Sequence, residues 1–391
     1  MMGTVSDSLP PPYGAASLAE ILPAVAAHVL TAPDRAAEGA RDVLGLPPSR
    51  RYVVCLVDGL GTDILHATAD EAPVLAAALG TAIPLSSTHP STTATAITTL
   101  STGTAPGRHG IVGYSFRSAP GRLLNALTWA GGPRDPVAFQ PVPTWWERLA
   151  GRGVATSAVA PEEFMGTGLT RASLRGARFV PVADERDSGT RIAQAVAASA
   201  RGEASLVYVY ERSLDRAGHT HGWRSPQWRQ ALAWVDGLVG GLRASLDPDV
   251  CLLVTGDHGM VDVPADRRIV LEDEPRLVRD VALVGGEARC RFVYTDEPER
   301  VAAAWAAVLG ERALVVRGDD AIEDGWFDEV PARLRSRIGD VVAVLRQNWA
   351  LTTRTVPGEA RMVGMHGGAT RSEMGVPLLI DPGGGSDGGT R

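Results

Sequence analysis

Short apolar runs alternate along the chain with longer segments in which apolar residues recur at helical spacing. The apolar runs occupy residues 52–57, 154–159, 206–210, 250–255 and 376–380. The segments with helical spacing occupy residues 17–30, 94–100, 190–201 and 226–246. Unbroken apolar strands are typical of a parallel sheet that helices cover on both faces. The alternation therefore predicts an α/β fold, with a doubly wound, mostly parallel sheet sandwiched by helices.

The pattern changes between residues 264 and 361. Here a strand-like run at 290–294, a helical segment at 297–309 and a further strand-like run at 313–317 follow one another. We interpret this segment as a small inserted α+β subdomain within one α/β domain of residues 15–382. The Pro-rich residues 1–14 are expected to be loose, and the Gly-rich tail 383–391 to be disordered.

Composition excludes several classes of protein. The 391 residues are 45% hydrophobic and 21% charged, which is ordinary for a globular protein. A net charge of −7 argues against a general nucleic-acid-binding surface. Cys55 and Cys251 lie inside strand-like runs, and with Cys290 they make an odd count, so they are read as reduced thiols. The N-terminus lacks the pattern of a secretory signal, and no apolar run is long enough for a membrane span, so we expect a cytoplasmic protein with no membrane association.

Candidate metal ligands follow the apolar runs. Asp58 comes directly after the run 52–57, and the pair Asp257-His258 comes just after the run 250–255. Open α/β sheets bind their ligands at the carboxyl edge of the strands, where such residues meet. Each motif alone is weak; for example, an i,i+4 Asp-His pair could be a surface pair. Together the ligand-type residues predict a two-metal hydrolytic centre made of Asp58, Asp215, His219, Asp257, His258 and His366.

A candidate nucleophile lies in the hydroxyl-rich stretch Pro90-Ser91-Thr92-Thr93, just before the helical segment 94–100. The first turn of a helix offers free N–H groups and a partial positive charge, which would bind a phosphate and favour an ionised hydroxyl. Simple N-capping is the usual role of Ser and Thr at this position. On the local sequence alone, N-capping is the favoured interpretation.

The motifs occur in an order that resembles the alkaline phosphatase superfamily. More narrowly, the chain is similar to the type I phosphodiesterase / nucleotide pyrophosphatase branch. The matching motifs are Val57-Asp58-Gly59, Pro90-Ser91-Thr92-Thr93, Thr102-Gly103 with His109-Gly110, Asp215-Arg216-Ala217-Gly218-His219, Thr255-Gly256-Asp257-His258-Gly259 and His366-Gly367.

The resemblance implies roles for these residues. Thr93 would be the nucleophile, would contact the metals and would form a covalent phospho-threonine intermediate. One zinc would be held by Asp215, His219 and His366, and the other by Asp58, Asp257 and His258. Manganese accepts the same ligands. The substrate would be a small-molecule phosphate ester or a nucleotide.

One position departs from the family pattern. Relatives carry an Asn three residues after the nucleophile, where it is expected to contact a phosphoryl oxygen, and this chain has Ala96 there. A phosphomonoesterase or a phosphonate hydrolase on the same site therefore stays an alternative. A sulfatase is disfavoured, because Thr93 lacks the neighbouring Pro and Arg of a sulfatase motif. The alternative outside enzymes is a metal-stripped binding or scaffold protein, and the sequence leaves the oligomeric state open.

Residues outside the metal motifs carry weaker signals. Tyr114, Tyr210 and Glu211 are candidates for a leaving-group pocket, with packing an equally good interpretation. Arg212 and Arg216 flank the Asp215 motif and could meet an anionic substrate, although exposed Arg is common.

Overall fold

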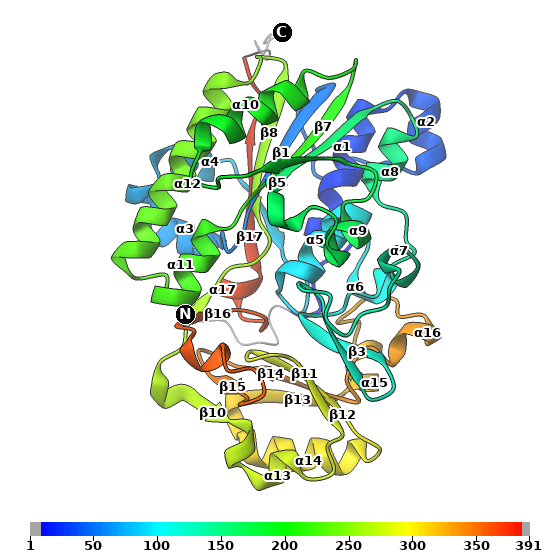
Figure 1. Cartoon of the computed structure of the whole chain (residues 1–391), viewed down its shortest axis with the longest axis vertical. Coiled ribbons are helices and arrows are strands. Elements are labelled where there is room, and N and C mark those ends of the chain that lie inside the picture. Colours follow the sequence, from blue (N-terminus) through cyan, green and yellow to red (C-terminus); the bar gives the residue numbers. More distant parts are fainter. Residues whose placement is uncertain (1–8, 385–391) are drawn as a thin grey trace.

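The computed structural model describes residues 9–384 and is built around one seven-stranded sheet. Its order is β2 (Ile83–Ser86), β17 (Gly375–Asp381), β8 (Val250–Gly256), β1 (Arg51–Val57), β7 (Ser205–Glu211), β5 (Ala155–Pro161) and β6 (Arg178–Val182). The strand β1 pairs in parallel with both β7 and β8, whereas β17 is antiparallel to β8 and to β2. The prediction of a mostly parallel α/β sheet is confirmed (Figure 1).

Helices cover both faces of this sheet. On one face lie α1 (Ile21–Val29), α5 (Thr93–Thr102) and α8 (Trp145–Ala150). On the other face lie α3 (Thr62–Ala67), α4 (Pro73–Leu79), α10 (Ser188–Ser199) and α12 (Pro226–Ser245). Alternate residues of β1 enter the two hydrophobic cores: Val54 faces the first, and Val53 faces the second. Because both faces of the strand are buried, its sequence is apolar without interruption.

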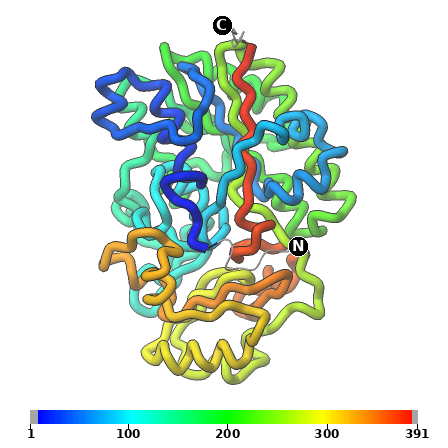
Figure 2. The backbone as a smooth tube through the Cα atoms, turned by 180° about the vertical axis from the view of Figure 1, so that it is seen from behind, coloured from blue at the N-terminus to red at the C-terminus, as the bar shows by residue number. Residues whose placement is uncertain are grey.

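A second, antiparallel sheet lies within residues 264–361, which we call the cap region. Its strands are ordered β11 (Leu283–Glu287), β12 (Cys290–Tyr294), β14 (Val341–Leu345) and β13 (Ala313–Arg317). The helix α14 (Pro298–Leu309) covers one face through Trp305. The other face packs through Phe292 against the main domain, next to the hairpin β3 (Ser115–Ala119) and β4 (Arg122–Asn125). Figure 2 shows the cap region, yellow to orange, at one end of the molecule, and β17 in red running through the main domain.

The remaining helices and short strands connect these layers. They are α2 (Ala32–Glu38), α6 (Pro106–His109), α7 (Pro136–Phe139), α9 (Gly168–Ser173), α11 (Ser213–His221), β9 (Val261–Asp262), β10 (Arg268–Val270), α13 (Pro275–Val278), α15 (Gly318–Glu323), α16 (Ala332–Arg335), β15 (Ala350–Thr352), β16 (Gly364–Met365) and α17 (Arg371–Met374). Within residues 9–384, no helix is both long and apolar enough to cross a bilayer. The three cysteines are free and buried, as their positions in the sequence predict.

Candidate metal centre

The carboxyl ends of the central strands bring the first candidate ligands together. Val57, the last residue of β1, lies opposite Gly256 of β8 and Glu211 of β7. The next residues are therefore neighbours at the same edge of the sheet. Gly59 makes the turn after β1 with φ of +81°, and a Cβ there would lie 3.2 Å from Asp215. This turn has to be a glycine, because it combines a left-handed conformation with a close approach of two chain segments.

Three residues form what we call the buried group: Asp58, Asp257 and His258. His258 Nε2 lies 3.4 Å from Asp58 Oδ1 and 3.5 Å from Asp257 Oδ2. The backbone amides of Gly59 and His258 donate to Asp257 Oδ1, and the Tyr210 hydroxyl donates to Asp58 Oδ2. The other oxygen of each carboxylate is buried and accepts no hydrogen bond from the described residues.

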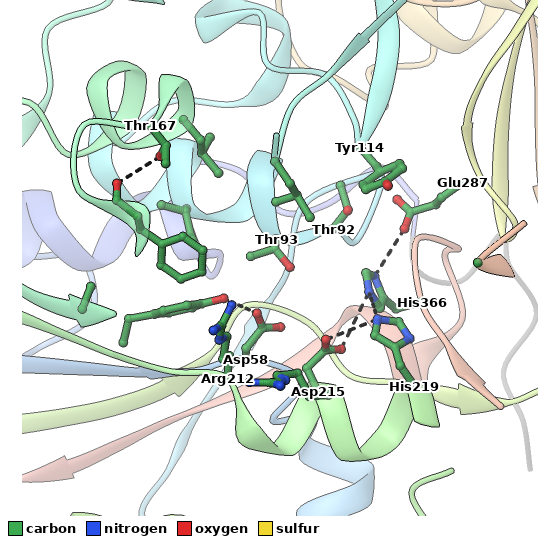
Figure 3. Close-up of a pocket in the computed structure, with 18 of the residues that line it drawn as sticks. Asp58, Thr92, Thr93, Tyr114, Thr167, Arg212, Asp215, His219, Glu287 and His366 are labelled. Atoms are coloured by element: carbon green, nitrogen blue, oxygen red, sulfur yellow. Dashed lines mark hydrogen bonds and ion pairs between the residues drawn. The ribbon is translucent and has the colours of Figure 1, made fainter. Parts of the chain in front are cut away.

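Three further residues form the helix–loop group: Asp215 and His219 from α11, and His366 from the loop after β16 (Figure 3). His219 Nε2 lies 3.2 Å from Asp215 Oδ2 and 3.3 Å from His366 Nε2. Asp215 Oδ1 is 3.8 Å from His366 Nε2 and has no hydrogen-bond partner among the described residues. The two groups adjoin, because the His258 and His366 rings stack with centroids 3.6 Å apart.

Each of the three histidines holds its Nδ1 against a backbone carbonyl. The acceptors are Gly364 for His219, Gly259 for His258 and Ser91 for His366, at 2.9, 3.0 and 2.9 Å respectively. A carbonyl only accepts, so each Nδ1 carries a proton, and Nε2 is the nitrogen that is available to a metal ion. The three Nε2 atoms all face the carboxylates described above. Metal-binding histidines are commonly fixed in this way by the groups around them.

The donor atoms fit a pair of metal ions. For metal–ligand bonds of about 2.0–2.1 Å in a tetrahedral site, neighbouring donor atoms lie about 3.3 Å apart. The closest donor pairs in both groups are 3.2–3.5 Å apart. The ligand atoms form two sets in which all atoms lie within 4.8 Å of one another, Asp58 with Asp257 and His258, and Asp215 with His258 and His366. His258 thus stands between the groups, and His219 completes the second set. The structure brings together all six residues proposed from the sequence.

The electrostatics of the six residues show why a cation would stabilise them. Burial, followed by the charges of Asp257 and Asp215, raises the pKa of Asp58 well above its usual value. Burial likewise raises the pKa of Asp257. Burial and the neighbouring histidines His258 and His219 lower the pKa of His366 well below its usual value, so this ring stays neutral. Closely spaced buried carboxylates beside imidazole rings are the arrangement that a divalent cation stabilises.

Thr93 is the first residue of α5 and points at the buried group. Its Oγ1 lies 3.2 Å from His258 Nε2, and the residue is almost fully buried. Thr92 is the N-cap of α5, but its side chain makes no capping hydrogen bond. The interpretation of these hydroxyls as simple helix caps is therefore wrong. The chain places Thr93 Oγ1 beside the ligand atoms, at the end of a helix whose first amides lack intrahelical partners.

Ser91 links the loop before the candidate nucleophile Thr93, residues 87–92, which we call the nucleophile loop, to the His366 loop, a role that the sequence did not reveal. Its hydroxyl donates to Gly368 O at 2.7 Å and accepts from Gly367 N at 3.2 Å, while its carbonyl accepts from His366. On the far side of that loop, Glu373 accepts from Gly368 N and forms a buried ion pair with Arg289 of the cap region. The position of His366 thus depends on contacts between segments far apart in the sequence.

A cavity of about 400 Å³ opens beside Thr93 and has two chemically different ends. One end is apolar and aromatic and is lined by Ile97, Phe164, Leu174, Phe179, Tyr208 and Tyr210. The other end lies against the cap region and is lined by Thr92, Tyr114, Glu287, Val356, Glu359 and Met362. Burial raises the pKa of Glu287 well above its usual value, and a hydrogen bond from Thr92 opposes this shift.

The structure corrects the expectation about Ala96. This residue is fully buried, packs in the core under the main sheet and does not line the cavity, so a side chain at this position would not reach a phosphoryl oxygen. Tyr114 and Tyr210 do line the cavity, whereas Glu211 forms a buried ion pair with Arg191 instead. Arg212 and Arg216 lie at the mouth. Arg212 stacks over Phe164 and pairs with Glu163 and Glu185.

Comparison with solved structures shows the same fold in several enzymes. Murine ectonucleotide pyrophosphatase / phosphodiesterase 5 matches with a TM-score of 0.66 and 20% identity, over 84% of this chain and 87% of that one. The same murine protein as an inactive T72A variant in complex with AMP matches with a TM-score of 0.65 and 20% identity, over 84% and 87% of the two chains. Phosphonoacetate hydrolase from Sinorhizobium meliloti 1021 matches with a TM-score of 0.62 and 20% identity, over 86% and 90%.

Comparison of sequences gives a local and a nearly complete match. The human GPI ethanolamine phosphate transferase 3 catalytic subunit is 36% identical over 59 residues, which is 15% of this chain and only 5% of that protein. The model of the family described as type I phosphodiesterase / nucleotide pyrophosphatase matches residues 52–369. This span contains both candidate ligand groups, Thr93 and the cap region. The chain belongs to the type I phosphodiesterase / nucleotide pyrophosphatase family.

Proposed function

We propose that this protein is a zinc-dependent phosphodiesterase of the nucleotide pyrophosphatase type, with Thr93 as its nucleophile. One observation carries the proposal. The Nε2 atoms of three histidines and three carboxylate oxygens without hydrogen-bond partners converge beside Thr93 Oγ1. A scaffold protein without metal would have no reason to keep this set, because buried unpaired carboxylates destabilise a fold.

Zinc is the proposed metal because of the donor set and its spacing. Imidazole nitrogens and carboxylate oxygens separated by tetrahedral edges suit zinc, while manganese is usually bound by more oxygen ligands in octahedral geometry. Two bound zinc ions would supply Lewis acidity to the phosphoryl group and would favour the ionised form of the attacking hydroxyl.

The proposed reaction has two steps, and residues of the chain take part in both. Thr93 Oγ forms a bond to phosphorus while the bond from phosphorus to the leaving oxygen breaks, which gives a phospho-threonine ester and an alcohol or phosphate product. Water subsequently cleaves the ester and restores Thr93. The first amides of α5, which lack intrahelical acceptors, would donate to the phosphoryl oxygens and stabilise their charge.

The apolar end of the cavity would take the planar organic group of the substrate. Phe164 and Tyr210 form an edge-to-face pair with ring centroids 6.0 Å apart, and Phe179 lines the same end. Such a surface suits a planar group, for example a nucleobase or an aryl ring. The AMP complex of the murine relative supports a nucleotide as substrate.

The test is a rate comparison between bis(4-nitrophenyl) phosphate and 4-nitrophenyl phosphate, with zinc, for wild type and Thr93→Ala. We expect the diester to be preferred and the substitution to lower kcat by about a thousandfold or more, since it removes the nucleophile. The zinc content and the melting temperature of Thr93→Ala should match wild type. Preference for the monoester would make the protein a phosphatase, and near-normal activity of Thr93→Ala would show that water attacks directly.

A further inference from the structure

A buried ion pair crosses the boundary between the main domain and the cap region. Arg289 directly precedes β12, and Glu373 belongs to the short helix α17, which lies between the two sheets in Figure 1. Arg289 Nη2 donates to Glu373 Oε2 at 2.7 Å, and Arg289 Nε donates to Glu373 Oε1 at 2.9 Å. Both side chains are fully buried. Because guanidinium and carboxylate are both planar, the two parallel hydrogen bonds fix the distance and the orientation of the two segments.

On the cap side, main-chain contacts hold Arg289 in place. Its guanidinium also donates to the carbonyl of Gln347, at 2.7 Å, and to the carbonyl of Trp349. Its own carbonyl accepts from Leu345 N at 2.9 Å. These three partners belong to β14 and to the turn that follows it. The position of the guanidinium is therefore set by the sheet of the cap region.

On the main-domain side, the Glu373 carboxylate binds the His366 loop. Its Oε1 accepts from Gly368 N at 2.9 Å, and its Oε2 accepts from the amide and the hydroxyl of Thr370 at 3.2 and 2.6 Å. A Cβ on Gly368 would lie 2.7 Å from Oε2, so the loop packs closely around the carboxylate. From the other side, Ser91 accepts from His366 Nδ1 and donates to Gly368 O. The loop is thus held between Ser91 and Glu373.

The main chain of Glu373 supports the buried group in a different way. Its carbonyl accepts from Gly259 N at 2.8 Å, and Gly259 O in turn accepts from His258 Nδ1. This contact uses backbone at the start of β17 and does not need the glutamate side chain. Loss of the pair between Arg289 and Glu373 should therefore loosen the His366 loop and spare the buried group.

A second buried pair shows what distinguishes the first. Arg291 and Glu359 form an ion pair that stays within the cap region. The pair between Arg289 and Glu373 instead joins the cap region to a loop that carries a candidate ligand. A buried ion pair rarely stabilises a fold more than apolar side chains of the same size. Its geometry is what such a pair can fix, and here it fixes the side of the His366 loop that faces away from Ser91.

We propose that Arg289 is a positioning residue that holds His366 in place through Glu373, and thereby sets the affinity of the helix–loop group for its metal ion. The inference rests on the proposed function, because it takes that group to bind zinc. It goes beyond that function by giving the cap region a part in the metal centre. Docking of the cap region and binding of the ion then favour each other, since both order the same loop.

The experiment measures both zinc affinities by competition with an indicator, in wild type and in Arg289→Met, which has an apolar side chain in place of the guanidinium. The ion of the helix–loop group is identified as the one that His219→Ala removes. We expect this ion to lose about tenfold in affinity, the lower end of the range for groups that orient ligands, and the other ion to keep its affinity. In the His219→Ala background, Arg289→Met should therefore have no effect on zinc binding.

A matched control separates positioning from a loss of stability. Val301 is buried on α14, which covers the face of the cap sheet away from the main domain. Val301→Ala should lower the melting temperature and leave both zinc affinities unchanged. Arg289→Lys keeps the charge but cannot form the two parallel hydrogen bonds, so its affinity for the ion of the helix–loop group should lie between those of wild type and Arg289→Met.

A second variant covers the case in which Arg289→Met does not fold because Glu373 is left unpaired. Arg289→Met combined with Glu373→Gln leaves no unpaired charge and should show the same loss of about tenfold, because the link to the cap region is gone. Hydrogen exchange of the metal-free protein gives a readout without zinc. Residues 364–370 should exchange faster than in wild type, and residues 257–261 should exchange at the wild-type rate.

The outcomes distinguish the two proposals. Unchanged affinities in Arg289→Met, or equal weakening of both ions, overturn this inference and leave the phosphodiesterase intact. Exchange of residues 364–370 at the wild-type rate in the metal-free variant also overturns it. A wild-type protein that binds no zinc overturns both proposals.

Discussion

The two candidate ligand groups differ in how the chain builds them. In the buried group, the side chains of Asp257 and His258 are 0% exposed, and both carboxylates directly follow neighbouring parallel strands. In the helix–loop group, His219 is 21% exposed, and His366 arrives from a loop beyond the whole cap region. One group is therefore fixed by the central sheet, and the other depends on contacts between α11, the His366 loop and the nucleophile loop.

This difference predicts an order of metal binding. A preorganised, buried site binds a metal with less cost in conformational freedom than a site assembled from a helix and a loop. We therefore expect the buried group to bind its ion more tightly, and the helix–loop group to exchange its ion first.

Among changes to the two ligand groups, the largest effect is expected from Asp257→Asn. The amide keeps an oxygen that can accept from Gly59 N and His258 N, but it removes a ligand charge from the buried group. Zinc content should fall from about two to about one per chain, with kcat reduced by about a hundredfold or more. The chelated variant should melt a few degrees higher than chelated wild type, because burial raises the pKa of Asp257 and makes its ionised form costly. Unchanged zinc content would remove Asp257 from the ligand set.

The second prediction concerns chelator challenge. With a chelator of intermediate affinity, the wild type should lose its metal in two steps, measured as zinc released to a colorimetric indicator. His219→Ala should remove the first step and leave the second, because it alters only the helix–loop group. A single step for both ions, or loss of the second step in His219→Ala, would show that the two groups do not bind independently.

The third prediction concerns pH. The raised pKa values of Asp58 and Asp257 mean that, in the ion-free protein, these carboxyl groups keep their protons above their usual value of 3.8. A metal ion has to displace these protons, so its affinity for the buried group should fall as pH falls through the raised values. The fall should approach about two orders of magnitude per pH unit where both groups are protonated.

The helix–loop group should respond less in the same range. Burial lowers the pKa of His366, so this ring has no proton to displace near neutral pH. Proton release on zinc binding, measured by calorimetry in buffers of different ionisation enthalpy, checks the difference. Equal proton release by Asp257→Asn and wild type would contradict it.

The same difference explains how much could be predicted from the sequence. The central strands were predicted to within a residue or two at each end, because burial on both faces makes their residues uniformly apolar, as in β1 and β8. The edge strands β2 and β6 were missed, because their residues are partly exposed and break the apolar run. The antiparallel direction of β17 was also missed, since a buried strand has the same composition in either direction.

The residues of the site were also predictable only where the local sequence carries a signal. All six ligand-type residues could be named because they follow strands or form short motifs, as Asp257-His258 does. Residues that act through the tertiary structure gave no signal. Ser91 was one of several hydroxyls before a helix, and Arg289 preceded an ordinary strand in the cap region. Ala96 was expected to lack a phosphoryl contact because of its short side chain, and the structure adds that this residue faces the core.

The smallest effect is expected from substituting two serines, each of which donates a hydrogen bond to a backbone carbonyl beside one of the ligand groups. Ser91 Oγ donates to Gly368 O beside the helix–loop group, and Ser87 Oγ donates to Asp257 O beside the buried group. Ser91→Ala should weaken the more labile zinc about tenfold, the lower end of the range for groups that orient ligands, because the His366 loop loses its link to the nucleophile loop.

Ser87→Ala should change the affinity of the tighter zinc by less than this factor, because Asp257 is also fixed by the end of β8 and by Gly59 N. Both variants remove one hydroxyl from a buried position, so the loss of packing is matched. Competition between each variant and a zinc indicator gives the two affinities. If Ser87→Ala weakened its zinc as much as Ser91→Ala, the sheet would not be what holds the buried group in place, and the proposed order of metal binding would lose its physical basis.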